Sequence, residues 1–175
     1  MRVIVIGAGI VGAALADRLA RSADVTVVEE RRVGSGTTGS SLAWLNANDP
    51  GDPDYQALRV DALRAWRRLA EEFADPSWYR AAGNTVWAVS EQGRALLTDR
   101  VARLRGLGYA AELITPDRLR DLEPFVRASG DAVIAHYPDE GYVHGALAAA
   151  ALADRARGAG ARLVTGTAVA GLNLR

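Results

Sequence analysis

A glycine motif, Gly7-Ala-Gly-Ile-Val-Gly12, constrains the fold of this chain most strongly because of what flanks it. Before it stands the β-branched run 2–6, Arg-Val-Ile-Val-Ile, which predicts a strand buried on both faces of a parallel sheet. After it, apolar residues recur at helical spacing over 10–21 and predict a helix. A second apolar run at 25–28 completes a β-α-β unit with two parallel strands.

The three glycines of the motif each have a physical task in such a unit. Gly7 permits the tight turn out of the strand, Gly9 lets a pyrophosphate approach the backbone, and Gly12 lets the helix pack closely on the strand. The helix N-terminus adds free N–H groups and a partial positive charge, which favour phosphate. The motif alone is a weak signal, but the strand before it and the helix after it support a dinucleotide site.

Glu29 ends the second strand of this unit, where a carboxylate can accept hydrogen bonds from the hydroxyls of a ribose. A negative charge there also repels a 2′-phosphate and so disfavours NADP. Glu30 follows directly and competes for the same role, but alternation along a strand points only one of the two inward. Solvated charges at a strand end are the alternative interpretation for both residues.

The stretch 34–41, Gly-Ser-Gly-Thr-Thr-Gly-Ser-Ser, follows the acidic strand end. Glycines and small hydroxyl residues allow close backbone approach and several hydrogen bonds to phosphate or ribitol, which favours FAD over NAD. The same composition also suits a flexible surface loop. The two interpretations stay open at this point.

Further along the chain, hydrophobic periodicity and turn signals predict a mixture of helices and strands. Helices are predicted at 54–74, 91–107, 117–122 and 145–157, and strands at 84–89, 111–114, 132–137, 161–165 and 168–174. This order predicts an interrupted nucleotide-binding layer, formed by 1–48 and 140–175, with residues 49–139 inserted as a second layer of helices and strands.

Composition excludes several classes of function. The 175 residues include no cysteine and carry a formal net charge of zero, so thiolate metal sites and nucleic-acid partners are not expected. All basic residues are arginine, so no lysine can form a Schiff base, and the two histidines do not suggest a metal site. No run is long and apolar enough to predict a membrane span or a signal peptide, so a cytoplasmic protein is expected.

Several stretches make the sequence resemble a known family. They are VIVIGAGIVGAALADRLA at 3–20, VTVVEE at 25–30, GSGTTGSSLAWLNAN at 34–48, DEGYV at 139–143 and GARLVTGTAV at 160–169. On these residues the chain resembles the D-amino-acid-oxidase-like FAD-dependent oxidoreductases, which include glycine oxidases, sarcosine oxidases and D-amino-acid dehydrogenases. The resemblance is close at both ends of the chain and loose in the middle.

The resemblance implies an α/β fold, with a Rossmann-type, three-layer FAD/NAD(P)-binding domain and part of an inserted α+β substrate layer. It also implies FAD as the cofactor and an amine or amino acid as the substrate. The residues that it assigns to FAD are Ile10 and Val11 at the pyrophosphate turn, Glu29 at the adenosine ribose, Thr37 and Thr38 at the phosphates or ribitol, Leu42, Ala43 and Trp44 beside the isoalloxazine ring, and Val169 near the adenine. For Val169 an ordinary buried strand residue is the alternative.

Members of this family have a second half, which supplies further substrate-layer strands and an arginine for the substrate carboxylate. The chain is therefore expected to be a fragment, a subunit whose partner supplies the rest, or a nucleotide-binding module without activity of its own. No residue of this chain is assigned a catalytic role. His136, His144, Tyr137 and Tyr142 are not expected to have one, because flavin-based oxidation of a neutral amine needs no strong enzymic base.

Overall fold

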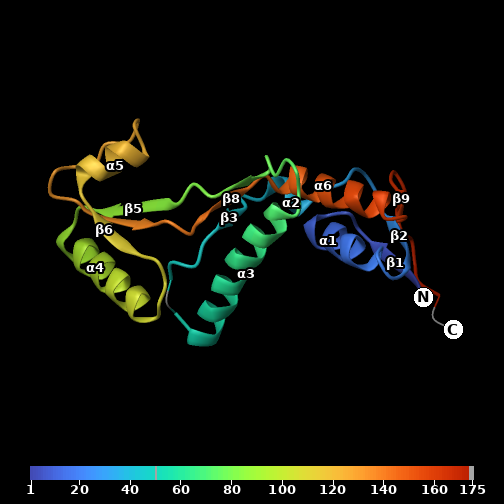
Figure 1. Ribbon diagram of the computed structural model, residues 1–175, viewed down its shortest axis with the longest axis horizontal. Helices are drawn as coiled ribbons and strands as arrows, with labels where there is room; N and C mark the ends of the chain where they lie inside the picture. The colour runs from blue at the N-terminus through green and yellow to red at the C-terminus, as the bar shows by residue number, and fades with distance from the viewer. Residues whose placement is uncertain (50, 174–175) are drawn as a thin grey trace. The chain divides into compact units, whose positions relative to one another are not determined.

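The computed structural model describes residues 1–49 and 51–173. The chain forms two compact units (Figure 1). We call them the terminal unit, Met1–Ala43 with Val143–Arg175, and the central unit, Trp44–Tyr142. The sequence predicted a nucleotide-binding layer at 1–48 and 140–175 and an inserted layer at 49–139, with boundaries a few residues from those of the two units. The functional meaning of this division stays a prediction.

The described helices and strands alternate along most of the chain. In chain order they are β1 (Arg2–Ile6), α1 (Ile10–Leu19), β2 (Asp24–Val28), α2 (Thr37–Ser40), β3 (Trp44–Leu45), α3 (Pro53–Glu71), β4 (Tyr79–Arg80), β5 (Asn84–Ala88), α4 (Glu91–Gly106), β6 (Glu112–Ile114), α5 (Pro116–Leu122), β7 (Val133–Tyr137), β8 (Gly141–Val143), α6 (Gly145–Gly158) and β9 (Arg162–Val164).

The terminal unit is built on a parallel sheet in the order β1-β2-β9. β1 and β2 pair from Arg2 opposite Asp24 to Ile6 opposite Val28, so the predicted β-α-β unit is confirmed. Helices α1 and α6 pack against each other (Figure 1). Val5 and Val27 lie in one buried cluster with alanines of both helices, which places the helices over one face of the sheet.

The other face of this sheet is not covered by the described residues. Ile4 and Ile6 alternate with the buried Val5, and their side chains are 70% and 54% exposed. Among the described strands, β1 pairs only with β2, so its second edge is open as well. The prediction that residues 2–6 are buried on both faces is therefore wrong for this chain by itself, because only α1 and α6 supply a covering layer.

A buried ion pair joins the two helices of the terminal unit. Asp17 of α1 is only 2% exposed, and its two carboxylate oxygens accept hydrogen bonds from Arg155 of α6. The guanidinium donates through Nε at 2.6 Å and through Nη2 at 2.7 Å. This bidentate geometry suits an arginine and a carboxylate, and it fixes α1 against α6.

The central unit contains two antiparallel sheets. The larger has the order β5-β7-β6, and α4 packs on it, with Leu104 buried beside Ala135 and Tyr137 of β7. The smaller has the order β3-β8-β4, with Trp44 opposite Tyr142.

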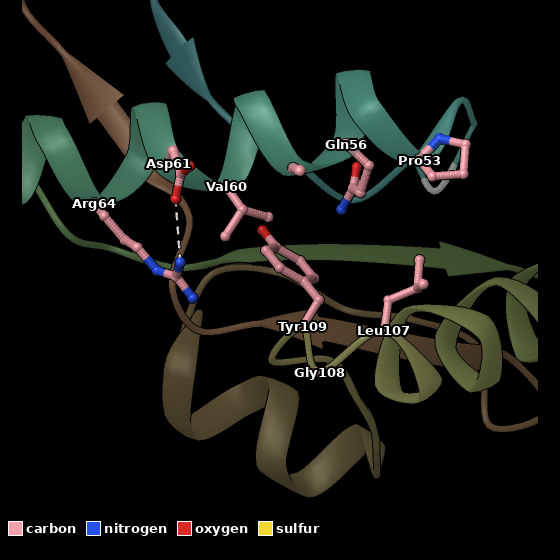
Figure 2. Close-up of a pocket in the computed structure, with 9 residues that line it drawn as sticks. Pro53, Gln56, Val60, Asp61, Arg64, Leu107, Gly108 and Tyr109 are labelled. Atoms are coloured by element: carbon pink, nitrogen blue, oxygen red, sulfur yellow. Dashed lines mark hydrogen bonds and ion pairs between the residues drawn. The ribbon is translucent and has the colours of Figure 1, made fainter.

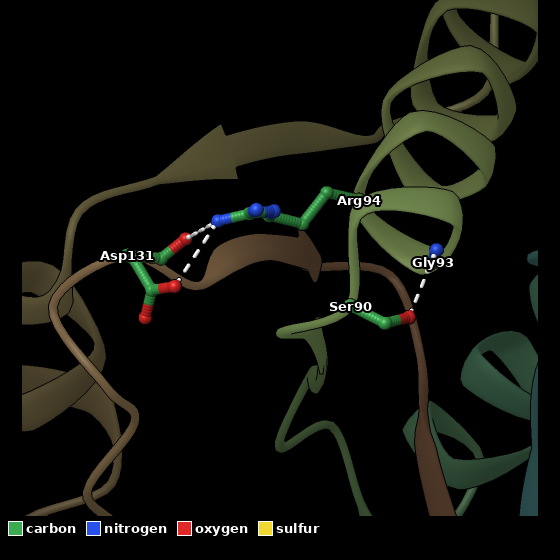
Figure 3. A network of polar contacts seen from close by, with 4 residues as sticks. All are labelled: Ser90, Gly93, Arg94 and Asp131. Carbon is green, nitrogen blue, oxygen red and sulfur yellow. Dashed lines mark hydrogen bonds and ion pairs between the residues drawn. The ribbon is translucent and has the colours of Figure 1, made fainter.

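Polar contacts fix the start of α4 in the central unit (Figure 3). Ser90 caps the helix by accepting a hydrogen bond from the Gly93 amide at 3.2 Å. One turn into the helix, Arg94 donates to the backbone carbonyl and the carboxylate of Asp131, at 3.0 and 3.1 Å. The two contacts attach α4 to the segment that leads into β7.

The strand predicted at 168–174 does not form over 168–173, and residue 174 lies outside the described residues. A strand needs a neighbour to pair with, and β9 is the last described member of its sheet. The backbone just before this segment is held by the residue that follows β2, since the Thr167 amide donates to the Glu29 carbonyl at 3.0 Å.

Four short elements were not predicted: α2, β3, β4 and β8. They are too short for a periodic pattern to reveal them.

Candidate cofactor-binding site

The glycine motif forms the turn between β1 and α1. Gly7 has a φ of +92°, a conformation that favours glycine, and its amide donates to the Val28 carbonyl of β2 at 2.8 Å. A Cβ on Gly12 would lie 2.0 Å from the Gly7 carbonyl oxygen, so α1 can begin this close to β1 only without that atom. Gly9 precedes α1 as its N-cap and offers no side-chain acceptor to the first N–H groups.

Glu29 reaches from the end of β2 to this turn. Its Oε2 accepts a hydrogen bond from the Ala8 amide at 2.8 Å, and its Oε1 accepts one from the Arg31 amide at 2.9 Å. The bond from Ala8, and then that from Arg31, lower the pKa of this carboxyl below its ordinary value. The side chain is only partly exposed. The turn therefore carries an anchored carboxylate with acceptor capacity left for a ligand hydroxyl.

The Gly/Ser/Thr-rich stretch also reaches the turn. The Thr38 hydroxyl accepts a hydrogen bond from the Ile10 amide at 2.9 Å, at the first residue of α1. The Gly34 amide donates to the Ala8 carbonyl at 2.9 Å, which fixes the start of the stretch beside the motif. Residues 37–40 form the short helix α2, so the stretch 34–41 is not a purely flexible loop.

A surface hollow of about 690 Å³ in the terminal unit is lined by β1, the glycine motif, α1 and part of residues 37–41, while Glu29 does not line it. The predicted cofactor residues that line it are Gly7, Gly9, Ile10, Val11, Gly12, Thr37 and Thr38. Backbone amides at a helix start suit a diphosphate, and the Thr38 hydroxyl and Glu29 carboxylate suit phosphate and ribose. The residues present therefore fit a dinucleotide.

Residues 41–43 have an unusual backbone. Ala43 has a φ of 49°, and among the described residues it is the one non-glycine in the left-handed region. Its amide donates to the Ser41 hydroxyl and its carbonyl accepts from the Val143 amide, both at 3.0 Å. Strained backbone of this kind occurs often at functional sites. Leu42 beside it is 84% exposed, and Trp44 begins β3 of the central unit.

Glu30 and Val169 make no contact with the glycine turn that the structure describes. Glu30 is exposed beyond the end of β2. Val169 is 41% exposed in a segment without regular structure, which contradicts its interpretation as an ordinary buried strand residue. A cofactor contact for either residue stays a prediction.

A second hollow, of about 340 Å³, lies in the central unit between α3 and the turn after α4 (Figure 2). Gln56 and Val60 of α3 and Tyr109 of the turn point into the space between these elements. An exposed ion pair between Asp61 and Arg64, 3.2 Å long, lies on its rim. No predicted cofactor residue lines this hollow.

The chain matches the family model described as FAD dependent oxidoreductase over residues 2–175. It belongs to this family. The resemblance inferred from the sequence is thereby confirmed, as is its Rossmann-type α/β fold class, and FAD is the cofactor of the family. In the part of the chain that the structure describes, no helix combines the length and the apolar character needed to cross a membrane.

Three similar proteins illustrate how far the likeness extends. A 4-methylaminobutanoate oxidase (formaldehyde-forming) of Paenarthrobacter nicotinovorans is 30% identical over 173 residues, which is 97% of this chain and 21% of that protein. The mitochondrial pyruvate dehydrogenase phosphatase regulatory subunit of Mus musculus is 24% identical over 96% of this chain and 19% of that protein.

The third, the solved glycine oxidase of Geobacillus kaustophilus, has 27% identity and a TM-score of 0.80, covering 94% of this chain and 47% of that one. The chain thus spans less than half the length of each of these three proteins.

Sequence reasoning missed the backbone and hydroxyl groups that hold these residues in place. The Ala8 amide orients Glu29, and the Ser41 hydroxyl binds the Ala43 amide. Backbone amides leave no signal in a sequence, and a serine in a Ser-rich stretch does not stand out.

Replacing Glu29 with alanine is expected to weaken FAD binding by about 1–3 kcal/mol, the scale of a hydrogen bond to a charged group. Quenching of flavin fluorescence on binding measures the affinity. The pKa of the Glu29 carboxyl is lowered in the folded protein. The ionised carboxylate therefore contributes its full share of folding stability above the ordinary carboxyl pKa of about 4.3, and this share is lost as pH falls through the lowered pKa. The neighbouring Glu30→Ala is the matched control, and equal losses in both variants would contradict the assignment to Glu29.

Proposed function

We propose that this chain is the FAD-binding part of an oxidoreductase that oxidises an amine or amino acid at a C–N bond to an imine, which then hydrolyses. The observation that carries the proposal is that two segments from elsewhere in the sequence meet at the glycine turn. The Glu29 carboxylate and the Thr38 hydroxyl each accept a hydrogen bond from the glycine motif, through the amides of Ala8 and Ile10. Because the chain belongs to a family of FAD-dependent oxidoreductases, we take FAD to be the dinucleotide bound at this turn.

Each part of the cofactor then has residues assigned to it. The motif from Gly7 to Gly12 forms the turn at the pyrophosphate, with Ile10 and Val11 beside it. Glu29, with Glu30 as its competitor, binds the adenosine ribose. The remaining assignments are Thr37 and Thr38 to the phosphates or ribitol, Leu42, Ala43 and Trp44 to the isoalloxazine ring, and Val169 to the adenine.

Bound FAD supplies a two-electron acceptor, a chemistry that protein side chains lack. The residues of this chain bind and orient it: the anchored carboxylate fixes the ribose, and the amides at the start of α1 neutralise the phosphates. No side chain of this chain is assigned the transfer of a proton. The substrate arginine is expected from polypeptide outside residues 1–175.

The uncovered face of the terminal sheet supports a need for further polypeptide. Parallel sheets are normally covered on both faces, and β1 is an inner strand in dinucleotide-binding sheets. Here Ile4 and Ile6 are 70% and 54% exposed. We expect a second half, in the same polypeptide or in a second subunit, to cover this face.

Flavin absorbance of the purified protein, followed by its bleaching when small amines or amino acids are added without oxygen, tests the function. A yellow protein that bleaches with at least one of them supports it. Bound flavin that no amine or amino acid reduces, in the protein with its second half present, would contradict the enzymic function and leave cofactor binding intact.

The alternative is a nucleotide-binding module without activity of its own. One of the similar proteins is itself named a regulatory subunit, which favours keeping this alternative. Flavin binding without reduction by any amine, together with a tight complex with another protein, distinguishes it. The cytoplasmic location stays a prediction from the sequence, and cell fractionation tests it.

A further inference from the structure

Glu140 is a fully buried carboxylate in the central unit, at the turn between β7 and β8. Its Oε1 accepts hydrogen bonds from the Ala47 amide at 2.9 Å and from the Tyr109 hydroxyl at 2.8 Å. Its Oε2 accepts one from Asn48 Nδ2 at 2.9 Å. Three donors from two other segments therefore meet on one side chain.

The peptide of Ala47 is held from both sides by side chains. Glu140 binds its amide, and Gln56 Nε2 of α3 donates to its carbonyl at 2.6 Å. Ala47 is completely buried and lies outside any strand, so its backbone groups have no ladder to pair in. These two side chains replace the missing strand partner.

Strand β8, which follows Glu140 directly, also holds the residues just before Ala47. Leu45 of β3 lies opposite Gly141, and Trp44 lies opposite Tyr142. Segment 44–48 is thus bound at one end by the backbone of β8 and at the other by the Glu140 side chain. The course of the whole segment depends on both.

Burying a charged carboxylate at this position costs free energy, because the group loses its hydration. Burial raises the pKa of Glu140, while the hydrogen bonds from Ala47, Tyr109 and Asn48 act in the opposite direction. A buried apolar side chain would avoid the desolvation but would leave three buried donors without an acceptor. Only an acceptor with two oxygens serves all three without rearrangement.

We propose that Glu140 is a positioning residue: it fixes segment 44–48 and, through Trp44, the protein surface beside the isoalloxazine ring. This inference rests on the proposed function, which assigns Trp44 to the flavin. Glu140 acts through hydrogen-bond geometry and not through its charge. Its loss should therefore change the environment of the bound flavin, while a neutral acceptor of equal length should restore it.

The test uses the flavin-loaded protein with its second half present, in three variants. Glu140→Ala removes every acceptor. Glu140→Gln keeps an oxygen for Ala47 and Tyr109, and its amide nitrogen can donate to Asn48 once that side chain flips. Tyr109→Phe removes one donor and leaves the bonds to Ala47 and Asn48, so it is the control for a general loss of stability.

Circular dichroism in the visible flavin bands and the Kd for FAD are the readouts. We expect Glu140→Ala to alter the dichroism and to raise Kd roughly tenfold, the effect of about one lost hydrogen bond. The Kd of Glu140→Gln for FAD should stay within about twofold of that of the original protein. Tyr109→Phe should lower the melting temperature but leave the dichroism unchanged.

Unchanged dichroism and Kd in a folded Glu140→Ala protein overturn the proposal, as does an equal spectral change in Tyr109→Phe. A change in Glu140→Gln as large as that in Glu140→Ala overturns the geometric role. If Glu140→Ala does not fold, Glu140→Asp replaces it, since the shorter side chain cannot reach all three donors, and an unchanged spectrum then counts against the proposal.

A protein that binds no flavin contradicts the proposed function and, with it, the flavin part of this inference. The positioning of segment 44–48 then has its own readout, hydrogen exchange at the Ala47 amide. Faster exchange in Glu140→Ala but not in Glu140→Gln supports it, and equal exchange in both overturns it.

Discussion

FAD affinity is expected to fall about a hundredfold or more when Gly12 is replaced by alanine. The new Cβ would lie 2.0 Å from the Gly7 carbonyl oxygen and 3.1 Å from its carbonyl carbon, so the backbone of the turn has to move. Overpacking of this kind costs about 1–3 kcal/mol even where side chains can shift, and here the obstacle is backbone. The displaced amides at the start of α1 would no longer point at the pyrophosphate.

Fluorescence titration with FAD measures the loss, and circular dichroism in the far ultraviolet checks that the protein is folded. Gly158→Ala, at the end of α6 in the same unit, is the matched control because an added Cβ there meets nothing within 4 Å. Affinity within twofold of the original protein in Gly12→Ala would show that this turn does not hold the pyrophosphate.

The largest loss of stability is expected from Asp17→Ala. The change removes the acceptor of two hydrogen bonds, at 2.6 and 2.7 Å, and leaves the Arg155 guanidinium, whose side chain is only 22% exposed, facing a buried cavity. Breaking a buried pair by removing one partner costs about 3–5 kcal/mol, and we expect about 3 kcal/mol because Arg155 keeps some contact with solvent. Urea unfolding measures the difference.

The control is Asp154→Ala, which breaks an exposed pair with Arg157 on the same α6. Its side chains are 71% and 60% exposed, so a loss under about 1 kcal/mol is expected. A double variant, Asp17→Leu with Arg155→Leu, should recover most of the stability, since it leaves no buried charge unpaired. Equal losses in Asp17→Ala and Asp154→Ala would contradict a structural role for the buried pair.

The sequence was sufficient for those parts of the site that depend on neighbours along the chain. The strand, glycine turn and helix of residues 2–19 follow from local periodicity, and the structure has them within two residues of the predicted bounds. Glu29 was identified because it ends the second strand of that unit. Local geometry carries this information, since a β-α-β unit fixes where the ends of its strands lie.

The short elements and the last predicted strand could not be inferred correctly from the local sequence. α2 is a single turn within a stretch whose composition suits a loop, and its contacts with α6 and with the start of α1 show why it is ordered. The strand predicted at 168–174 had apolar residues but no partner among the described strands over 168–173. Whether an apolar segment becomes a strand is decided by what lies beside it.

By itself, then, the sequence determined the nucleotide-binding turn, its acidic residue and the family. Only the tertiary structure decided which groups hold that turn and its surroundings in place. Thr38 meets Ile10 across 28 residues, Glu140 meets Ala47 across 93, and Arg155 meets Asp17 across 138. Hydrogen bonds of this range depend on the path of the whole chain, and no local pattern encodes them.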